Sequence, residues 1–242
     1  MKGIYRLAEK TIAVESLYDR VHRRFAGYRA DGEPDFSVTI VPSDLDYEQE
    51  RELICAEKEK RPPVMSSPES KEELAVYRKI AERMPDYDTF LFHGSVIAVD
   101  GEGYLFTAKS GTGKSTHTRL WREMLGERAV MVNDDKPLIR AAETVTVFGT
   151  PYNGKHNLGC NMSVPLKAVC ILTRAAENSI VRISKQEAYA MLLQQVFRPR
   201  DPAVMQKTLR LIDRLAAQTA LYRLGCNMEP EAAEVAFNGM KG

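Results

Sequence analysis

The feature that most constrains this chain is the segment AKSGTGKST at residues 108–116. Its spacing is that of a phosphate-binding P-loop, with Ala108 where the commonest form of the motif has its first glycine. Gly111 and Gly113 let the backbone bend, so that its N–H groups can approach phosphate oxygens in a concavity that side chains would block. The segment therefore predicts a binding site for a phosphorylated nucleotide.

Two side chains at the end of this segment add the charge and the ligand that a bound triphosphate requires. The Lys114 ammonium group attracts the β- and γ-phosphates, and the Ser115 hydroxyl group is a ligand for Mg²⁺. A helix that begins near Gly113 would direct its positive end at the anion. The predicted nucleotide-binding residues of this segment are Ser110, Gly111, Thr112, Gly113, Lys114, Ser115 and Thr116.

The residues on both sides of the segment support this interpretation. Residues 104–107 are apolar and β-prone, and residues 115–125 place Leu120 and Trp121 on one apolar helical stripe. A strand, a glycine-rich loop and a helix in this order form the context that the motif requires. The alternative is a glycine-rich turn with a capping serine, which would bind no nucleotide.

Composition excludes several classes of protein. The 242 residues contain 34 Lys and Arg against 33 Asp and Glu, so the chain lacks the strong positive charge of a non-specific nucleic-acid binder. The cysteines are widely spaced, which favours neither a zinc site nor a disulfide framework. We find no signal-peptide core and no apolar run long enough to cross a bilayer. We therefore expect a cytoplasmic protein that does not act on nucleic acid or at a membrane.

The pattern of strands, helices and prolines predicts two domains. Residues 1–66 contain three short strand patterns and a charged segment at 47–61, and they form a small N-terminal α/β appendage. The prolines at 62–68 break regular structure and predict a linker. Residues 67–242 form the larger P-loop domain, which we expect to be of the α/β class, with a mixed β-sheet and flanking helices.

Within the larger domain, the near-continuous apolar residues 90–99 predict buried strand, with a turn at His93-Gly94. Asp100-Gly101 is a hairpin signal, so residues 95–99 are expected to pair with residues 104–107. Residues 149–163 are rich in Gly and Asn and predict a long functional loop. The other expected helices cover residues 69–83, 184–197, 201–218 and 229–237. The other expected strands cover residues 129–132, 138–141, 145–148, 168–173, 180–183 and 220–224.

Asp134 and Asp135 follow the predicted strand at 129–132, shortly after the P-loop helix. A carboxylate in this position can hold Mg²⁺ opposite Ser115, while a second carboxylate accepts the proton of an attacking hydroxyl group. The alternative is that both residues only shape the turn before Pro137.

Three further side chains are candidates for the site. His93 precedes a glycine at a turn, where it could tune a carboxylate or orient a phosphate, or be a structural histidine. Lys155, in the loop at 149–163, could close over the γ-phosphate. His117, within the P-loop helix, is favoured as a structural or solvent-facing residue.

Taken together, these motifs resemble the catalytic core of bacterial HPr kinase/phosphorylase, which shares its fold with phosphoenolpyruvate carboxykinases. The resemblance covers residues 89–140 and rests on His93-Gly94, the hairpin, the P-loop and Asp134-Asp135. It implies ATP-dependent phosphorylation of a serine hydroxyl group. Asp134 would be the general base, and His93 would tune this carboxylate. Lys114 would bind phosphate, and Ser115 and Asp135 would lie at the metal.

The chain departs from this family in lacking a Glu-x-Arg-Gly signature after the acidic pair, so a third metal or phosphate ligand is not identified and HPr is not indicated as the acceptor. We expect an Mg-ATP-dependent phosphotransferase that acts on a hydroxyl group of a peptide, a protein or a small molecule. One alternative is a nucleotide-sensing module without catalysis. Another is an ATP-dependent carboxykinase, which would require further metal ligands and substrate arginines. A homo-oligomer is compatible with the resemblance, because these relatives assemble into rings.

Overall fold

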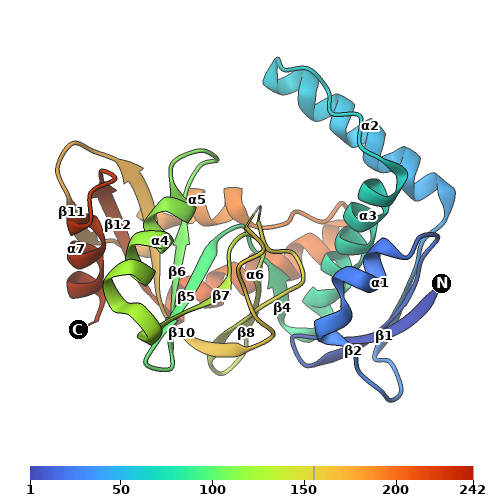
Figure 1. Cartoon of the computed structure of the whole chain (residues 1–242), viewed down its shortest axis with the longest axis horizontal. Helices are drawn as coiled ribbons and strands as arrows, with labels where there is room; N and C mark the ends of the chain where they lie inside the picture. Colours follow the sequence, from blue (N-terminus) through green and yellow to red (C-terminus); the bar gives the residue numbers. More distant parts are fainter. Residues whose placement is uncertain (155, 242) are drawn as a thin grey trace. The chain divides into compact units, whose positions relative to one another are not determined.

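The computed structural model describes residues 1–154 and 156–241 (Figure 1). The chain divides into two compact units, Met1–Arg83 and Met84–Gly242. The P-loop and the acidic pair both belong to the second unit, so this unit alone supplies the candidate site.

The first unit is a three-stranded sheet with helices. Strand β1 (Lys2–Leu7) pairs antiparallel with β2 (Lys10–Glu15), and β2 pairs parallel with β3 (Phe36–Thr39). The helices are α1 (Arg20–Arg24), α2 (Pro42–Glu59) and α3 (Pro68–Arg83), with a 3₁₀ turn η1 (Ala26–Tyr28). The charged segment at 47–61 lies almost entirely within α2.

The compact units divide at Arg83, whereas the sequence analysis placed the division at residue 66. Helix α3 accounts for the difference, because it packs on elements of the first unit. Arg78 of α3 donates hydrogen bonds to Glu48 (2.6 Å) and Asp44 (3.2 Å) of α2. The prolines at 62–68 therefore interrupt only the loop between two helices that pack together.

The second unit is built on a mixed sheet with the order β4-β8-β9-β10-β6-β5-β7, and β12 and β11 extend it beside β10. Strands β6, β10 and β12 are parallel, and all other pairs are antiparallel. The strands are β4 (Thr89–Leu91), β5 (Ser95–Val99), β6 (Glu102–Thr107), β7 (Ala129–Asn133), β8 (Leu138–Ala141), β9 (Val145–Phe148), β10 (Ser163–Arg174), β11 (Ser179–Arg182) and β12 (Ala220–Cys226). This mixed, helix-flanked sheet agrees with the predicted fold class.

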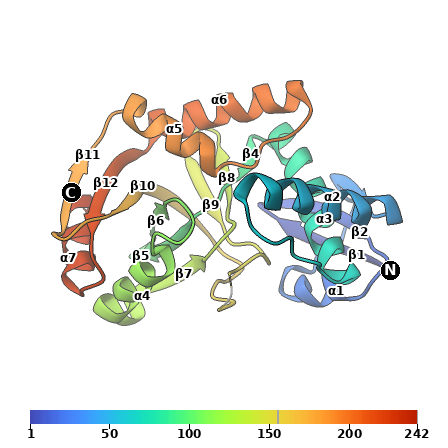
Figure 2. The same cartoon turned by 90° about the horizontal axis from the view of Figure 1, so that it is seen from above.

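Helices cover both faces of this sheet (Figure 2). Helices α5 (Lys185–Gln195) and α6 (Pro202–Gln218) pack on one face, and α4 (Lys114–Leu125) and α7 (Glu231–Met240) pack on the other. Side chains of β5 alternate between the two layers: Val96 and Ala98 join the α5/α6 core, and Ile97 and Val99 join the α4/α7 core. This alternation explains why the strand is apolar throughout, because both of its faces are buried.

The buried stretch at residues 90–99 is divided at the turn expected at His93-Gly94, because the backbone breaks between β4 and β5. At the break, the His93 N–H donates to the Gln195 carbonyl oxygen (2.7 Å) and the Gly94 N–H to the Asp135 carbonyl oxygen (3.0 Å). These non-ladder bonds compensate for the lost strand pairing. The break therefore carries His93 to the same edge of the sheet as the acidic pair.

Helix ends in the second unit follow their sequence signals. Ser184 and Glu187 form a capping box at the start of α5, and Asp201 caps α6 through the N–H groups of Ala203 and Val204. Short 3₁₀ turns η2 (Met84–Tyr87) and η3 (Gly126–Arg128) precede β4 and β7. Among the described residues, no helix is both long enough and apolar enough to cross a membrane.

Candidate functional site

The site lies at one edge of the large sheet, where three neighbouring strands meet. Strands β6 and β7 both run antiparallel to β5, so their C-terminal ends lie beside the start of β5. The P-loop follows β6 and the acidic pair follows β7, while Ser95 begins β5. The topology therefore brings together polar residues that are well separated in the sequence.

The P-loop leaves β6 after Thr107 and enters α4 at Lys114. Gly111 and Gly113 have φ angles of +75° and +118°, which L side chains rarely adopt. Gly113 is the N-cap of α4 and has no side chain with which to bond the first helical N–H groups. The Arg174 guanidinium donates to the Gly111 carbonyl oxygen (2.5 Å) and holds the loop against the end of β10. The open helix start is suited to an anion.

A buried asparagine fixes the turn that carries the acidic pair. Asn133 Oδ1 accepts hydrogen bonds from the N–H groups of Asp135 (3.0 Å) and Lys136 (2.7 Å). Its Nδ2 donates to the Thr150 hydroxyl oxygen (3.1 Å), and that hydroxyl donates to the Lys136 carbonyl oxygen (2.8 Å). The conformation of the turn is therefore determined by a closed polar network.

Asp134 points toward the P-loop helix. Its Oδ1 accepts hydrogen bonds from the hydroxyl groups of Ser95 (2.9 Å) and Ser115 (3.4 Å). Only 6% of the residue is exposed, and this burial raises the pKa of the carboxyl group above its ordinary value, against the opposing effect of the two serines. Asp134 is thus a shielded carboxylate next to a P-loop hydroxyl group.

Asp135 has different neighbours. Its Oδ1 lies 3.5 Å from His93 Nε2, and its Oδ2 lies 3.6 Å from Lys136 Nζ. Because His93 Nδ1 is 2.7 Å from Gln195 Oε1 and donates there, Nε2 can donate to Asp135 only when the imidazole is protonated. Burial, then the nearby Lys114 charge, lowers the pKa of His93.

Lys114 belongs to the P-loop and begins α4. Burial lowers the pKa of its ammonium group, while the charges of Asp135 and then Asp134 raise it. The P-loop lysine and both carboxylates are therefore within electrostatic reach of one another.

The neighbours of the two carboxylates differ from those that the family resemblance implies. His93 lies against Asp135, whereas it was expected to adjust Asp134. Ser115 lies against Asp134, whereas Asp135 was expected to share the metal with Ser115. Ser110, Thr112 and Thr116 are exposed or partly buried on the loop and the first turn of α4. Lys155 lies outside the described residues.

Four polar residues of this site were not singled out from the sequence: Ser95, Asn133, Thr150 and Gln195. Ser95, Asn133 and Thr150 are at most 1% exposed, and Gln195 is 8% exposed. Ser95 begins and Asn133 ends an otherwise apolar strand. Because a buried polar side chain needs a hydrogen-bond partner, a polar residue in this position is a sequence signal for a polar site. Gln195 carried none, because its role depends on α5 ending beside His93.

Two cavities adjoin the P-loop helix. One, of about 460 Å³, is lined by residues that include Ser115, Arg119, Arg122, Asp134 and His156. The other, of about 480 Å³, lies on the glycine side of the loop and is lined by residues that include Gly111, Gly113, Arg174, Cys226 and Met228. Thr116 lines both cavities. The loop is therefore flanked by a charged cavity and by a less polar one.

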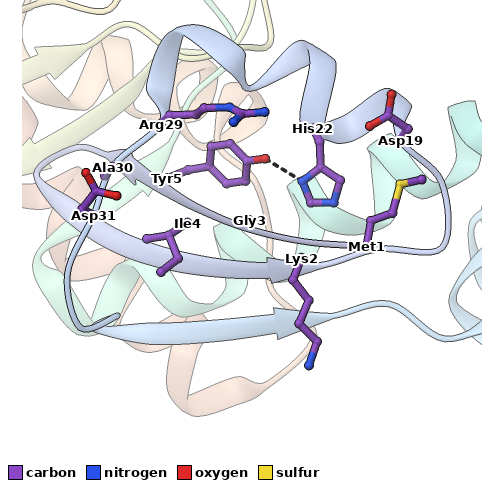
Figure 3. A pocket seen from close by; sticks show the side chains of 10 residues that line it. All are labelled: Met1, Lys2, Gly3, Ile4, Tyr5, Asp19, His22, Arg29, Ala30 and Asp31. Atoms are coloured by element: carbon purple, nitrogen blue, oxygen red, sulfur yellow. Dashed lines mark hydrogen bonds between the residues drawn. The ribbon is translucent and has the colours of Figure 1, made fainter.

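The first unit has a cavity of its own, of about 770 Å³, along β1 and the segment at 29–31 (Figure 3). Tyr5 and His22 both line it, and the Tyr5 hydroxyl oxygen lies 2.5 Å from His22 Nδ1. The Ser16 hydroxyl oxygen lies 2.7 Å from His22 Nε2. Burial raises the pKa of Tyr5 and lowers that of His22. Both groups are thus kept neutral and mutually bonded, which is typical of a structural network.

The residues of the site fit a bound Mg²⁺ ion only as a partial ligand set. In the chain outside residues 155 and 242, no three His, Cys, Asp or Glu side chains form a group that could hold a metal. Ser115 Oγ and Asp134 Oδ1 are adjacent oxygen donors, which suits Mg²⁺, since this ion usually keeps waters and takes further ligands from phosphates.

His117, on the buried side of α4, makes the stability of the second unit depend on pH. Burial lowers its pKa from 6.5 to about 4, and Trp121 Nε1 donates to its Nε2 (3.1 Å). Because the folded pKa is depressed, the unfolded chain takes up the proton first as pH falls. Stability is then complete above pH 6.5 and is lost toward pH 4, by roughly 3 kcal/mol in all.

Urea unfolding between pH 7.5 and pH 4.5 would measure this loss. The variant His117→Gln, whose amide oxygen can still accept from Trp121, is expected to lose less stability over this interval. His156→Gln, a change at an exposed histidine, is the matched control and should behave like the wild type. Equal pH dependence in the wild type and His117→Gln would contradict the assignment.

A comparison with protein families identifies a match over most of the chain. The family model described as "SynChlorMet cassette protein ScmC" matches residues 57–228. No curated protein matches the sequence. Among solved structures, the Hpr(Ser) kinase/phosphatase from Coxiella burnetii is weakly similar, with 9% identity and a TM-score of 0.36 over 63% of this chain and 99% of that chain.

Proposed function

The chain belongs to the family described as SynChlorMet cassette protein ScmC, and we propose that it transfers the γ-phosphoryl group of Mg-ATP to a hydroxyl group. The observation that carries this proposal is the juxtaposition of a P-loop helix start with a shielded carboxylate. Ser115 at the first turn of α4 and Asp134 after β7 share a hydrogen bond, and Lys114 lies beside them. Phosphoryl transfer requires mainly positioning and charge stabilisation, and these residues provide both.

The nucleotide would bind through the P-loop. The glycine conformations at 111 and 113 and the uncapped start of α4 suit phosphate oxygens, and Lys114 supplies a positive charge. Magnesium, when bound, would neutralise charge on the phosphates, and Ser115 with an acidic residue would hold it. Lys155 remains a proposed contact to the γ-phosphate.

Asp134 is the proposed general base. It lines the charged cavity beside the P-loop, so an acceptor hydroxyl group in that cavity can reach it. Its raised pKa favours proton uptake at the moment of attack. The acceptor oxygen forms a bond to the γ-phosphorus as the bond to the ADP oxygen breaks, and the proton passes to Asp134 and then to water.

Asp135 is proposed as the second carboxylate, near the metal and the phosphates. It lies beside His93, and its charge raises the pKa of Lys114, so it stabilises positive charge at the phosphate end of the site. His93, held by Gln195, would orient Asp135 and not Asp134. One chain contains every residue used in this assignment.

The test is transfer of label from γ-labelled ATP in the presence of Mg²⁺. Free serine, serine-containing peptides and a pool of small hydroxyl metabolites serve as acceptors. Label in a phosphomonoester product would support the proposal. Tight ATP binding without transfer to any acceptor would contradict it and would favour a nucleotide sensor.

A further inference from the structure

The charged cavity beside Asp134 has a feature that nucleotide binding does not explain. Its wall from helix α4 carries two arginines, Arg119 and Arg122, in addition to the P-loop residue Ser115. These three positions are spaced i, i+4 and i+7, so they share one face of α4. At 1.5 Å per residue, Ser115 and Arg122 are separated by about 10 Å along the helix axis. The long side chains of the two arginines lean back toward the helix start.

Arg122 makes no ion pair within residues 1–154 and 156–241. Its Nε atom is buried and has no hydrogen-bond partner there, while the residue as a whole is only partly buried. Arg119, in contrast, is half exposed and paired with Glu123 (2.6 Å). A guanidinium group has five N–H donors, and Arg122 lines the charged cavity, so its terminal N–H groups are available to a ligand there.

The ligand that completes this site is an anion, because a guanidinium group binds carboxylates and phosphates through paired hydrogen bonds. In the proposed function the phosphates of the nucleotide already have partners in Lys114 and in the open N–H groups at the start of α4, two turns before Arg122. The less polar cavity on the glycine side of the loop is available for the nucleoside, with Cys226 and Met228 on its wall. The anion at Arg122 therefore belongs to the acceptor.

We infer that the acceptor is a hydroxyl compound bearing a carboxylate or a phosphate, and that Arg122 binds this anion while the reacting hydroxyl group lies at Asp134. The inference rests on the proposed function, because the hydroxyl group is placed at Asp134. Arg119 lies at the same cavity and adds positive charge there. Neutral alcohols would lack this contact.

The test compares acceptors that differ in their anionic group. D-glycerate and sn-glycerol 3-phosphate are each compared with glycerol, L-serine with L-serinamide, and a Ser-Asp peptide with its Ser-Asn counterpart. We expect kcat/KM at least tenfold higher for the anionic member of at least one pair. Which pair responds separates a carboxylate source from a phosphate source.

Arg122→Gln is expected to raise KM for that anionic acceptor at least tenfold, with KM for ATP within twofold of the wild type. Arg122→Lys should restore part of the affinity, because it keeps the charge without the paired geometry. Arg210→Gln removes the same charge from an exposed position of α6, on the other face of the sheet. This variant should leave both KM values unchanged. Thermal melting of each variant checks that it is folded.

A binding measurement separates failure of this inference from failure of the proposed function. Isothermal titration of glycerate, glycerol 3-phosphate, serine and the Ser-Asp peptide into wild type and Arg122→Gln, with Mg-ADP present, needs no turnover. Binding that depends on Arg122 without phosphoryl transfer would support the anion site and overturn the kinase. Three results would overturn the anion site. These are equal kcat/KM for neutral and anionic acceptors, equal affinity of wild type and Arg122→Gln for the anionic probes, or neither binding nor transfer with any anionic probe.

Discussion

Replacing Lys114 by alanine is expected to weaken Mg-ATP binding by a factor of about 10 to 100. The ammonium group lies at the start of α4, next to two carboxylates, and hydrogen bonds to charged groups contribute about 1.5–3 kcal/mol. Its loss also removes a positive charge that acts on both Asp134 and Asp135, so a polyanionic ligand meets negative charge that is less fully compensated. Isothermal titration with Mg-ATP and Mg-ADP measures the change.

Lys109→Ala is the matched control for this experiment. Lys109 is an exposed lysine of the same loop, and its replacement removes the same charge without altering the helix start. We expect its ATP affinity to lie within a few-fold of the wild type. If Lys114→Ala bound Mg-ATP as tightly as Lys109→Ala, the segment at 108–116 would not be a nucleotide site.

Replacing Asp134 by asparagine is expected to reduce phosphoryl transfer by a factor of about 10² to 10⁴, the usual contribution of a general base, while Mg-ATP affinity changes only a few-fold. Asparagine keeps the shape of the side chain and an oxygen that can accept from Ser95 and Ser115. It cannot take up the proton of the acceptor. Single-turnover transfer from labelled ATP, together with titration of Mg-ATP, separates the two effects.

Asp135→Asn is the companion variant, since it makes the same isosteric change one residue later. If Asp135 serves the metal and the phosphates, this variant is expected to require more Mg²⁺ for half-maximal transfer. Transfer by Asp134→Asn at a rate close to the wild type would remove Asp134 from the role of base. A large loss only in Asp135→Asn would instead give that role to the Asp135–His93 pair.

Much of the second unit follows from local sequence patterns. The hairpin at Asp100-Gly101, the helix after the P-loop and the capping box at Ser184 each have short-range signals, and the structure confirms them. The sequence also predicts the acidic pair at a strand end. The fact that β6 and β7 end at the same edge follows from both being antiparallel to β5.

The parts that were not predictable depend on contacts between distant segments. The sequence indicates a turn at His93-Gly94 between two buried stretches, but not which groups its backbone N–H groups bind. These N–H groups donate to the carbonyl oxygens of Gln195, at the end of α5, and of Asp135, in the acidic turn, which are both distant in the sequence. The same contacts decide that His93 faces Asp135. Likewise, prolines between α2 and α3 predict a domain boundary, although tertiary packing keeps both helices in one unit.

The pairing of β10 has a consequence for the order in which the second unit folds. Leu105 of β6 pairs with nearby Val96 in a hairpin, but its other partner, Val169 of β10, comes far later in the chain. Closing a short loop costs less entropy than closing a long one, so the hairpin is expected to form early and the parallel pairing late. Arg174, which holds the P-loop at Gly111, ends β10. The loop would thus acquire its final conformation only in the last steps of folding, and a ribosome-bound chain that ends before β10 should not retain nucleotide.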